Sequence, residues 1–151
     1  MAEAPLRNQP LLTPEELTAR IGEFYKAVDE FNDGWYFESH ETLEDLWMVT
    51  PWPDRQFFQA IIQLAAAFVH YARGEYPGIL KLLDLSLEKL RDFAHEQFGV
   101  DVERLIGDVE RARAQVAAAG EDGFLSGPES RVPKVHWTRE AGGVTAEGAD
   151  S

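Results

Sequence analysis

Apolar residues recur every three or four positions through most of the first 120 residues, which is the spacing of a helix with one buried face. Turn-forming and helix-capping residues divide this pattern into five runs. The runs predict helices over residues 13–31, 33–48, 54–73, 77–98 and 101–120. No strand alternation interrupts them, so the sequence predicts an all-α fold: a single helical bundle of about five helices with an extended C-terminal tail.

Capping residues indicate where several of these helices begin. Thr13 and Glu16 suit the two ends of a capping box around Pro14, which is well placed at the first position of a helix. Asp33 and Asp54 are placed to cap the second and third helices. The third helix is apolar over most of its circumference, so we expect it to lie at the centre of the bundle.

The composition changes from Glu121 onward to Gly, Pro, Ser and acidic residues, which is typical of a tail. We therefore expect a helical bundle domain over residues 13–120 and a tail over residues 121–151 that is partly docked and partly disordered. Within this tail, residues 132–137 can lie extended against the bundle, with Val135 and Trp137 on one side. The final dozen residues are expected to be disordered.

The chain is strongly acidic, with a formal net charge of −13. Because phosphate binding needs clustered Lys and Arg, this charge argues against nucleic acid and against anionic membranes as partners. No run approaches the roughly 18 consecutive apolar residues of a membrane span. The chain has no cysteine, which excludes disulfides and thiolate metal sites, and we expect a cytoplasmic protein.

The predicted second helix carries the most chemistry. At 100° per residue, Tyr36, His40, Glu44 and Trp47 fall on one side of it, and Glu41 lies toward the edge of that side. Acidic and imidazole groups beside large apolar side chains form either a functional site or a structural network.

The predicted third helix has a matching polar stripe formed by Arg55, Gln59, Gln63 and His70. The short connection makes the two helices antiparallel neighbours. Counting outward from the turn places Trp47 opposite Arg55 or Gln56, and we expect Arg55 to lie near a carboxylate. The same count places Glu44 opposite Gln59, His40 opposite Gln63, and Asn32 or Asp33 near His70. We therefore predict a buried polar network of His, Glu, Gln and Arg side chains, because unpaired buried polar groups cost roughly 1–3 kcal/mol each.

These two segments resemble the signature of the domain of unknown function 309 family, whose members are bacterial and archaeal. The resemblance covers roughly residues 31–83, with Ser39 in place of the usual Ala and Ala60 in place of Gly. It implies an all-helical fold and implies no activity. The residues that match are Phe31, Gly34, Tyr36, Phe37, Glu38, His40, Glu41, Leu43, Glu44, Trp47, Arg55, Gln59, Ile62, Gln63, Leu64, Ala65 and Ala66.

Three functional hypotheses remain open. The leading one is a helical domain without catalysis, whose polar core fixes the helix register and lines a small-ligand pocket. The second is a metal-dependent or acid–base hydrolase that uses His40 and Glu44. The third is a homodimeric interaction module that uses exposed aromatic residues, although Trp35, Trp52 and Trp137 also suit a covering role at the end of the bundle.

The metal hypothesis has a defined ligand set. His40 and Glu44 are spaced i, i+4, with Glu41 or His70 as a third ligand, and such ligands suit Zn, Mn or Fe. A zinc-protease motif would need a second histidine where Glu44 stands. The acid–base hypothesis lacks a clear nucleophile, because neither Ser39 nor Thr42 lies at i+3 or i+4 from His40.

Overall fold

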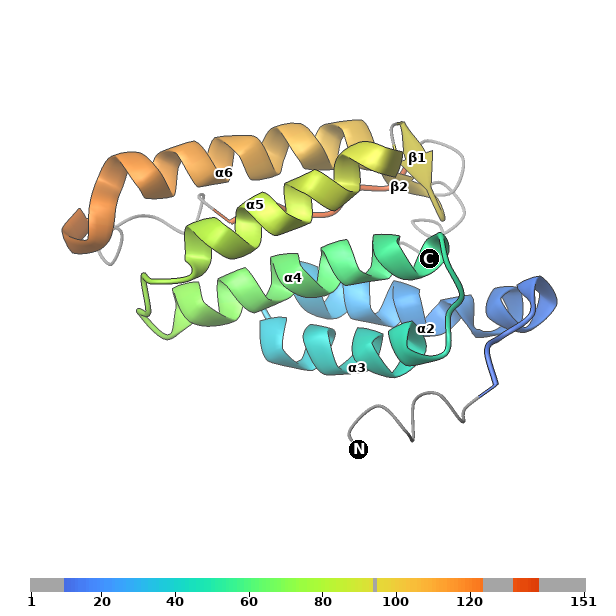
Figure 1. The fold of residues 1–151 in the computed structure, drawn as a ribbon. Helices are drawn as coiled ribbons and strands as arrows, with labels where there is room; N and C mark the ends of the chain where they lie inside the picture. Colours follow the sequence, from blue (N-terminus) through green and yellow to red (C-terminus); the bar gives the residue numbers. More distant parts are fainter. Residues whose placement is uncertain (1–9, 94, 124–131, 139–151) are drawn as a thin grey trace, which may run out of the picture.

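The described part of the protein is an all-α bundle, as the sequence predicts. The computed structural model describes residues 10–93, 95–123 and 132–138. Its helices are α2 (Pro14–Asn32), α3 (Tyr36–Met48), α4 (Asp54–Ala72), α5 (Ile79–Leu90) and α6 (Val102–Gly123), as Figure 1 shows. None of the helices in these ranges is long and apolar enough to cross a membrane.

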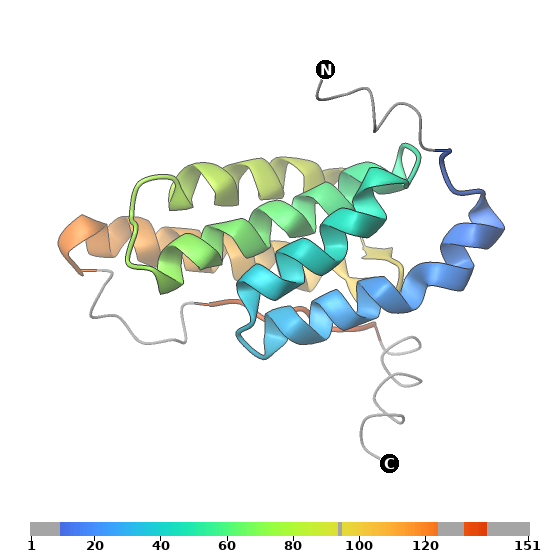
Figure 2. The same ribbon diagram turned by 90° about the horizontal axis from the view of Figure 1, so that it is seen from below.

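Helix α4 lies at the centre of the bundle. It packs against α3 on one side and α5 on the other, while α2 packs on α3 and α6 packs on α5 (Figures 1 and 2). The side chains of Phe57, Phe58, Leu64 and Phe68 are completely buried. Burying each such side chain stabilises the fold by about 1.5–3 kcal/mol. The prediction of a central third helix is therefore confirmed.

The helix starts follow the sequence at α2 and depart from it at α3 and α4. Thr13 and Glu16 form the predicted capping box, with hydrogen bonds of 2.9 and 3.1 Å. Asp33 does not cap α3: it ends α2, and α3 begins after Trp35 without a side-chain cap. Gly34 lies between the two helices with a φ of +92°. This left-handed conformation, which glycine adopts without steric cost, interrupts the helical path, so α3 starts in a new direction. Asp54 does not cap α4, because Pro53 is the cap residue and Asp54 is the first residue of the helix. The Asp54 carboxylate accepts a hydrogen bond from Gln97.

The predicted fourth helix is too long at both ends. Helix α5 begins at Ile79 and ends at Leu90, followed by the 3₁₀ turn η1 (Arg91–Phe93). A small antiparallel hairpin of β1 (Glu96–Gln97) and β2 (Val100–Asp101) comes next. The prediction of helix through Phe98, with no strand before residue 120, is therefore wrong. Phe98 turns the hairpin and stacks on the Phe58 ring at 5.3 Å, so a tertiary contact outweighs the local helical pattern.

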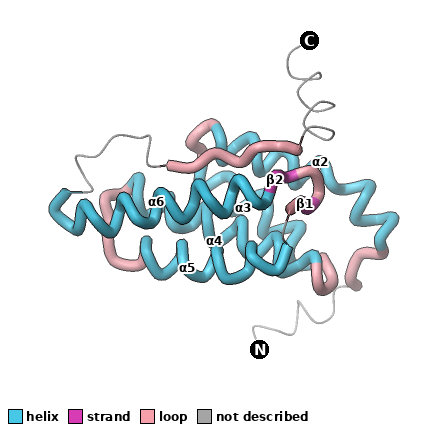
Figure 3. The backbone as a smooth tube through the Cα atoms, turned by 90° about the horizontal axis from the view of Figure 1, so that it is seen from above, coloured by secondary structure: helices cyan, strands magenta, loops and turns pink. Residues whose placement is uncertain are grey.

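The segment Val132–Thr138 runs extended along the bundle, on the side of α2 and the hairpin (Figure 3). Val135 is buried, and the Trp137 ring packs edge-on against Tyr25 at 5.2 Å. Trp137 also forms a β-bridge with Val100. Val135 and Trp137 thus both contact the bundle, as expected. The final dozen residues lie outside the described residues, and the division into a bundle domain and a tail stays a prediction.

Three buried hydroxyl groups hold neighbouring turns and helices together. Ser39 of α3 donates to the carbonyl oxygen of Ala27 in α2 at 2.7 Å, and Ser86 of α5 donates to that of Ala60 in α4 at 2.8 Å. The Thr50 hydroxyl, in the turn after α3, donates to the carbonyl oxygen of Leu46 near the end of that helix. Small hydroxyl side chains therefore allow close helix packing and satisfy their own hydrogen bonds.

Candidate functional site

A cavity of about 130 Å³ lies between the first turns of α3 and the last turns of α4. An adjoining hollow of about 270 Å³ shares Phe37, Val69 and Arg73 with it and extends toward Trp35. We call the two together the α3–α4 groove. The smaller cavity is lined by Phe37, His40, Ala66, Val69, His70 and Arg73.

Large aromatic side chains form the α3 side of this groove. Trp35 and Phe37 are 59% and 46% exposed, which is unusual for such apolar groups. Because they flank the helix start at Tyr36, they lie where α3 emerges from the Gly34 turn. The groove therefore offers apolar surface to a ligand or a partner.

His40 stands in the wall of the smaller cavity. It follows Phe37 by three positions, so the two rings lie on one face of α3, stacked at 6.3 Å with an interplanar angle of 22°. Its Nδ1 atom is buried and has no hydrogen-bond partner. Buried polar groups in native proteins are nearly always paired, so this atom calls for an explanation.

His70 and Arg73 come from the last turn and the C-cap of α4. The Nδ1 atom of His70 lies 2.8 Å from Oε1 of Glu75, which follows the turn at Gly74. This contact fixes the ring orientation and leaves Nε2 as the other ring nitrogen of a residue that lines the cavity. The Arg73 guanidinium lies 6.0 Å from the centre of the Phe37 ring. Sequence reasoning missed Phe37 and Arg73 as site residues, although Arg73 continues the spacing of Ala66 and His70.

The predicted contact between Trp47 and Arg55 is present. The Arg55 guanidinium carbon lies 4.4 Å from the centre of the Trp47 ring, a cation–π geometry. This pair lies toward the other end of α3 from Phe37, so Arg55 does not take part in the groove. Trp47 Nε1 is buried without a hydrogen-bond partner.

The predicted polar pairs between α3 and α4 are not formed. Gln63 Oε1 and His40 Nδ1 are both buried without a partner, and no hydrogen bond joins Glu44 to Gln59 in the described part of the chain. Glu44 and Glu41 are exposed. The side chain of Asn32 binds the backbone of Val135.

The failure of the His40–Gln63 pair has a geometric cause. Helical side chains lean toward the N-terminus of their own helix. In an antiparallel pair, His40 therefore leans toward the carboxyl end of α4, where it meets Ala66, Val69 and His70. Gln63 leans the opposite way. Counting Cα positions alone leaves out this displacement along the helix axis.

The predicted metal ligands are not gathered at one point. His40 and His70 line the same cavity, but the exposed carboxylates of Glu41 and Glu44 are not among its lining residues. Within residues 10–93, 95–123 and 132–138, no group of three or more His, Asp or Glu side chains is arranged to hold a metal ion. The structure thus gives His40 and Glu44 no third ligand.

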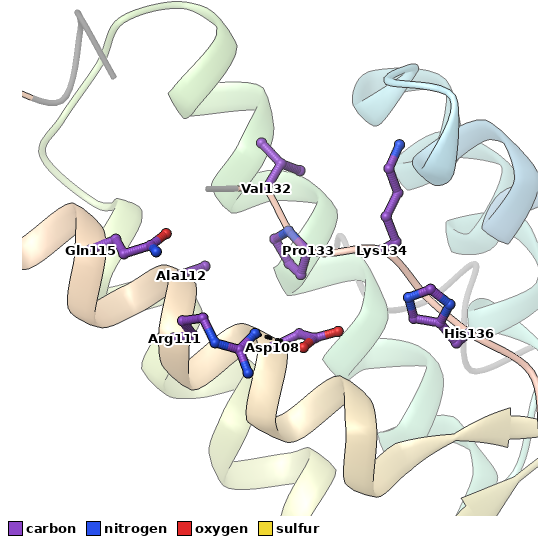
Figure 4. A pocket seen from close by; sticks show the side chains of 8 residues that line it. All are labelled: Asp108, Arg111, Ala112, Gln115, Val132, Pro133, Lys134 and His136. Atoms are coloured by element: carbon purple, nitrogen blue, oxygen red, sulfur yellow. Dashed lines mark hydrogen bonds and ion pairs between the residues drawn. The ribbon is translucent and has the colours of Figure 1, made fainter. Parts of the chain in front are cut away.

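A second cavity, of about 180 Å³, lies between α6 and the segment Val132–His136 (Figure 4). Its charged groups already have partners: Arg111 pairs with Asp108 at 2.8 Å, and Lys134 donates to the carbonyl oxygen of Asn32. Burial, followed by the charge of Arg104, lowers the pKa of His136, which favours its neutral form. We interpret this cavity as part of the contact between α6 and residues 132–136.

The fold and the groove together define a small all-α domain with a hollow at one edge. Residues 24–82 match the family model of the domain of unknown function DUF309, which confirms the resemblance for that part of the chain. Every residue that lines the smaller cavity lies inside the matched range. The family description assigns no reaction.

The curated relatives are similarly silent on chemistry. The chain is 33% identical over 84 residues to the uncharacterized protein YpuF of Bacillus subtilis (strain 168). The match covers 54% of this chain and 48% of that protein, so the chain spans about half the length of this relative. No solved structure matches the chain.

Proposed function

We propose that the α3–α4 groove binds a small molecule and that binding, not catalysis, is the function of this domain. One observation carries the proposal: His40 Nδ1 is buried without a partner in a residue that lines the cavity. Leaving such an atom unpaired costs about 1–3 kcal/mol. A ligand can reach this nitrogen once the ring rotates about its Cβ–Cγ bond, and the hydrogen bond would then remove the cost, so the site is better satisfied when it is occupied.

The composition of the groove supports the same proposal. Ligand sites are concave and mostly apolar, with a few polar groups that fix the orientation of the ligand. Here Phe37, Val69 and Ala66 supply the apolar surface, while His40 and His70 supply ring nitrogens.

A fragment screen by NMR on the full, ¹⁵N-labelled chain tests the proposal. We expect at least one compound from a set of small acids, amines and neutral aromatics to produce saturable shifts at Phe37, Ala66 and Val69. The amides of Asp108 and Ala112, beside the second cavity, serve as the internal control. A set that leaves the groove resonances unchanged, or that shifts both cavities alike, would refute a specific site.

The two other hypotheses have less support. A hydrolase would use His40 with Glu44, but His40 Nδ1 has no carboxylate partner and Glu44 is exposed. A homodimer would need a continuous apolar face. Trp35 and Phe37 lie at the amino end of α3, whereas Trp52, 72% exposed, lies beyond its other end.

The setting in which the domain works is also part of the proposal. We place it in the cytoplasm, without nucleic acid as a partner. The formal net charge of −13 supports the exclusion of nucleic acid, because a phosphate backbone would be repelled.

A further inference from the structure

We infer that the ligand of the α3–α4 groove is a small organic acid whose anionic group is bound by Arg73. This inference rests on the proposed function and adds the chemical class of the ligand. It depends on the sign of the charges around the smaller cavity, on the lack of an ion pair at Arg73, and on the shape of the groove.

One arginine lines the smaller cavity, and no acidic side chain of the described residues does. His40, His70 and Arg73 are its polar lining residues, and Phe37, Ala66 and Val69 are the rest. The whole chain has 27 Asp and Glu against 14 Lys and Arg. A cavity of this composition is therefore contrary to the overall charge of the protein, which indicates a preference for an anion.

Arg73 is available to bind a ligand. Several other arginines of the bundle pair with carboxylates: Arg20 with Glu23 and Arg113 with Asp84, for example. In the part of the chain that the structure describes, the Arg73 side chain lies over the face of Phe37 and forms no ion pair. A guanidinium group binds a carboxylate or a phosphate through two parallel hydrogen bonds, so this group suits an anionic ligand.

Two neighbouring carboxylates lie outside the lining of the smaller cavity. Glu75 accepts a hydrogen bond from His70 Nδ1 at 2.8 Å, and Glu38 lines only the adjoining hollow. The amino end of α3, which lies at the groove, has no side-chain cap. Helix amino ends carry a partial positive charge, which adds to the attraction for an anion.

The apolar walls indicate what the anionic group is attached to. A cavity of about 130 Å³ between Phe37 and Val69 accepts a group of a few carbon atoms. The adjoining hollow offers the exposed ring of Trp35 for a flat, larger part. An aromatic or short branched carboxylic acid satisfies both requirements, with its carboxylate at Arg73, which lines both hollows.

An NMR titration of the full chain with three matched probes tests this inference. Benzoate, benzamide and benzylammonium share one ring and differ in charge. We expect benzoate to shift the groove resonances with a Kd at least about tenfold lower than that of benzamide, and benzylammonium not to bind. Arg73→Gln should weaken benzoate binding by about tenfold or more, because an ion-paired hydrogen bond contributes about 1.5–3 kcal/mol. Arg91→Gln, which removes an exposed arginine of a surface pair with Glu110, is the matched control.

Each outcome separates the class of ligand from the existence of the site. If benzamide or benzylammonium binds the groove as well as benzoate, the site stands and the anion preference is overturned. If benzoate shifts the groove equally in Arg73→Gln, the role of Arg73 is overturned. If inorganic phosphate shifts the groove resonances and benzoate does not, the anion is a phosphate and the carboxylic acid is overturned. If none of these probes shifts the groove and the fragment screen also fails, the proposed function falls with the inference.

Discussion

The side chain of Asn32 binds both backbone groups of Val135. Its Nδ2 donates to the carbonyl oxygen of Val135 at 2.9 Å, and its Oδ1 accepts from the backbone N–H at 2.8 Å. The last residue of α2 thus acts as a neighbouring strand would, across 103 positions of sequence. Lys134 adds a hydrogen bond to the carbonyl oxygen of Asn32.

Asn32→Leu should therefore destabilise the protein by about 1–3 kcal/mol, because the paired N–H and C=O groups of Val135 lose their partners. Urea unfolding measures the change. Lys26→Leu, at an exposed position of the same helix, is the control and should stay within about 0.5 kcal/mol of the parent. An Asn32→Leu protein as stable as the control would show that the two hydrogen bonds between the Asn32 side chain and Val135 contribute nothing to the free energy of unfolding.

His40→Leu should leave the protein as stable as the parent or make it more stable, by up to about 1 kcal/mol. The substitution removes a buried ring nitrogen without a partner and keeps an apolar side chain beside Phe37. Thermal unfolding of His40→Leu and of the exposed control Glu41→Leu measures the effect. A loss of several kcal/mol at His40 alone would support the structural network expected from the sequence and weaken the ligand site.

Ser39 should tolerate loss of its hydroxyl group and not tolerate a larger side chain. Ser39→Ala removes one hydrogen bond to Ala27 and should cost about 0.5–1.5 kcal/mol. Ser39→Leu should cost more, about 1–3 kcal/mol, because it forces α3 away from α2. Chemical denaturation of both variants decides the matter, and equal losses would mean that α2 and α3 are not closely packed at this point.

Stability should fall as the pH drops below about 6.5, in part because of His136. Its pKa is lowered in the folded protein from the ordinary value of 6.5. Below that pH the unfolded chain binds a proton that the folded chain resists, so the equilibrium shifts toward unfolding. The loss stops once the pH passes below the lowered pKa of the folded state.

Comparing His136→Gln with the parent at pH 7.5 and pH 5.5 isolates this contribution. The variant should lose less stability than the parent across this interval, by urea unfolding. The pKa of His136 also depends on four neighbouring charged groups: Asp101, Arg104, Asp108 and Lys134. The substitution leaves these four groups in place, so the comparison measures the contribution of the histidine alone. Identical losses in the two proteins would assign the pH dependence to other groups.

The candidate site could be predicted only in part. The sequence places His40 and His70 in one polar feature, and both line the same cavity. Helical periodicity adds Glu41, Glu44, Arg55 and Gln59 to this feature, because it assigns residues to faces of a helix. Periodicity does not determine how far a side chain leans along its helix, and that displacement gives His40 its neighbours in the cavity.

The sequence by itself determined that helices α2 to α6 form and which faces of α2, α4 and α6 are buried. This information is local: apolar residues three and four positions apart predict the core residues of α2, α4 and α6, and the capping box at Thr13 predicts where α2 begins. The tertiary structure alone decided the hairpin at residues 96–101, the docking of Val135 on Asn32 and the position of Arg73 at the groove. Each of these depends on contacts between residues distant in the chain, which have no repeating spacing for a sequence to display.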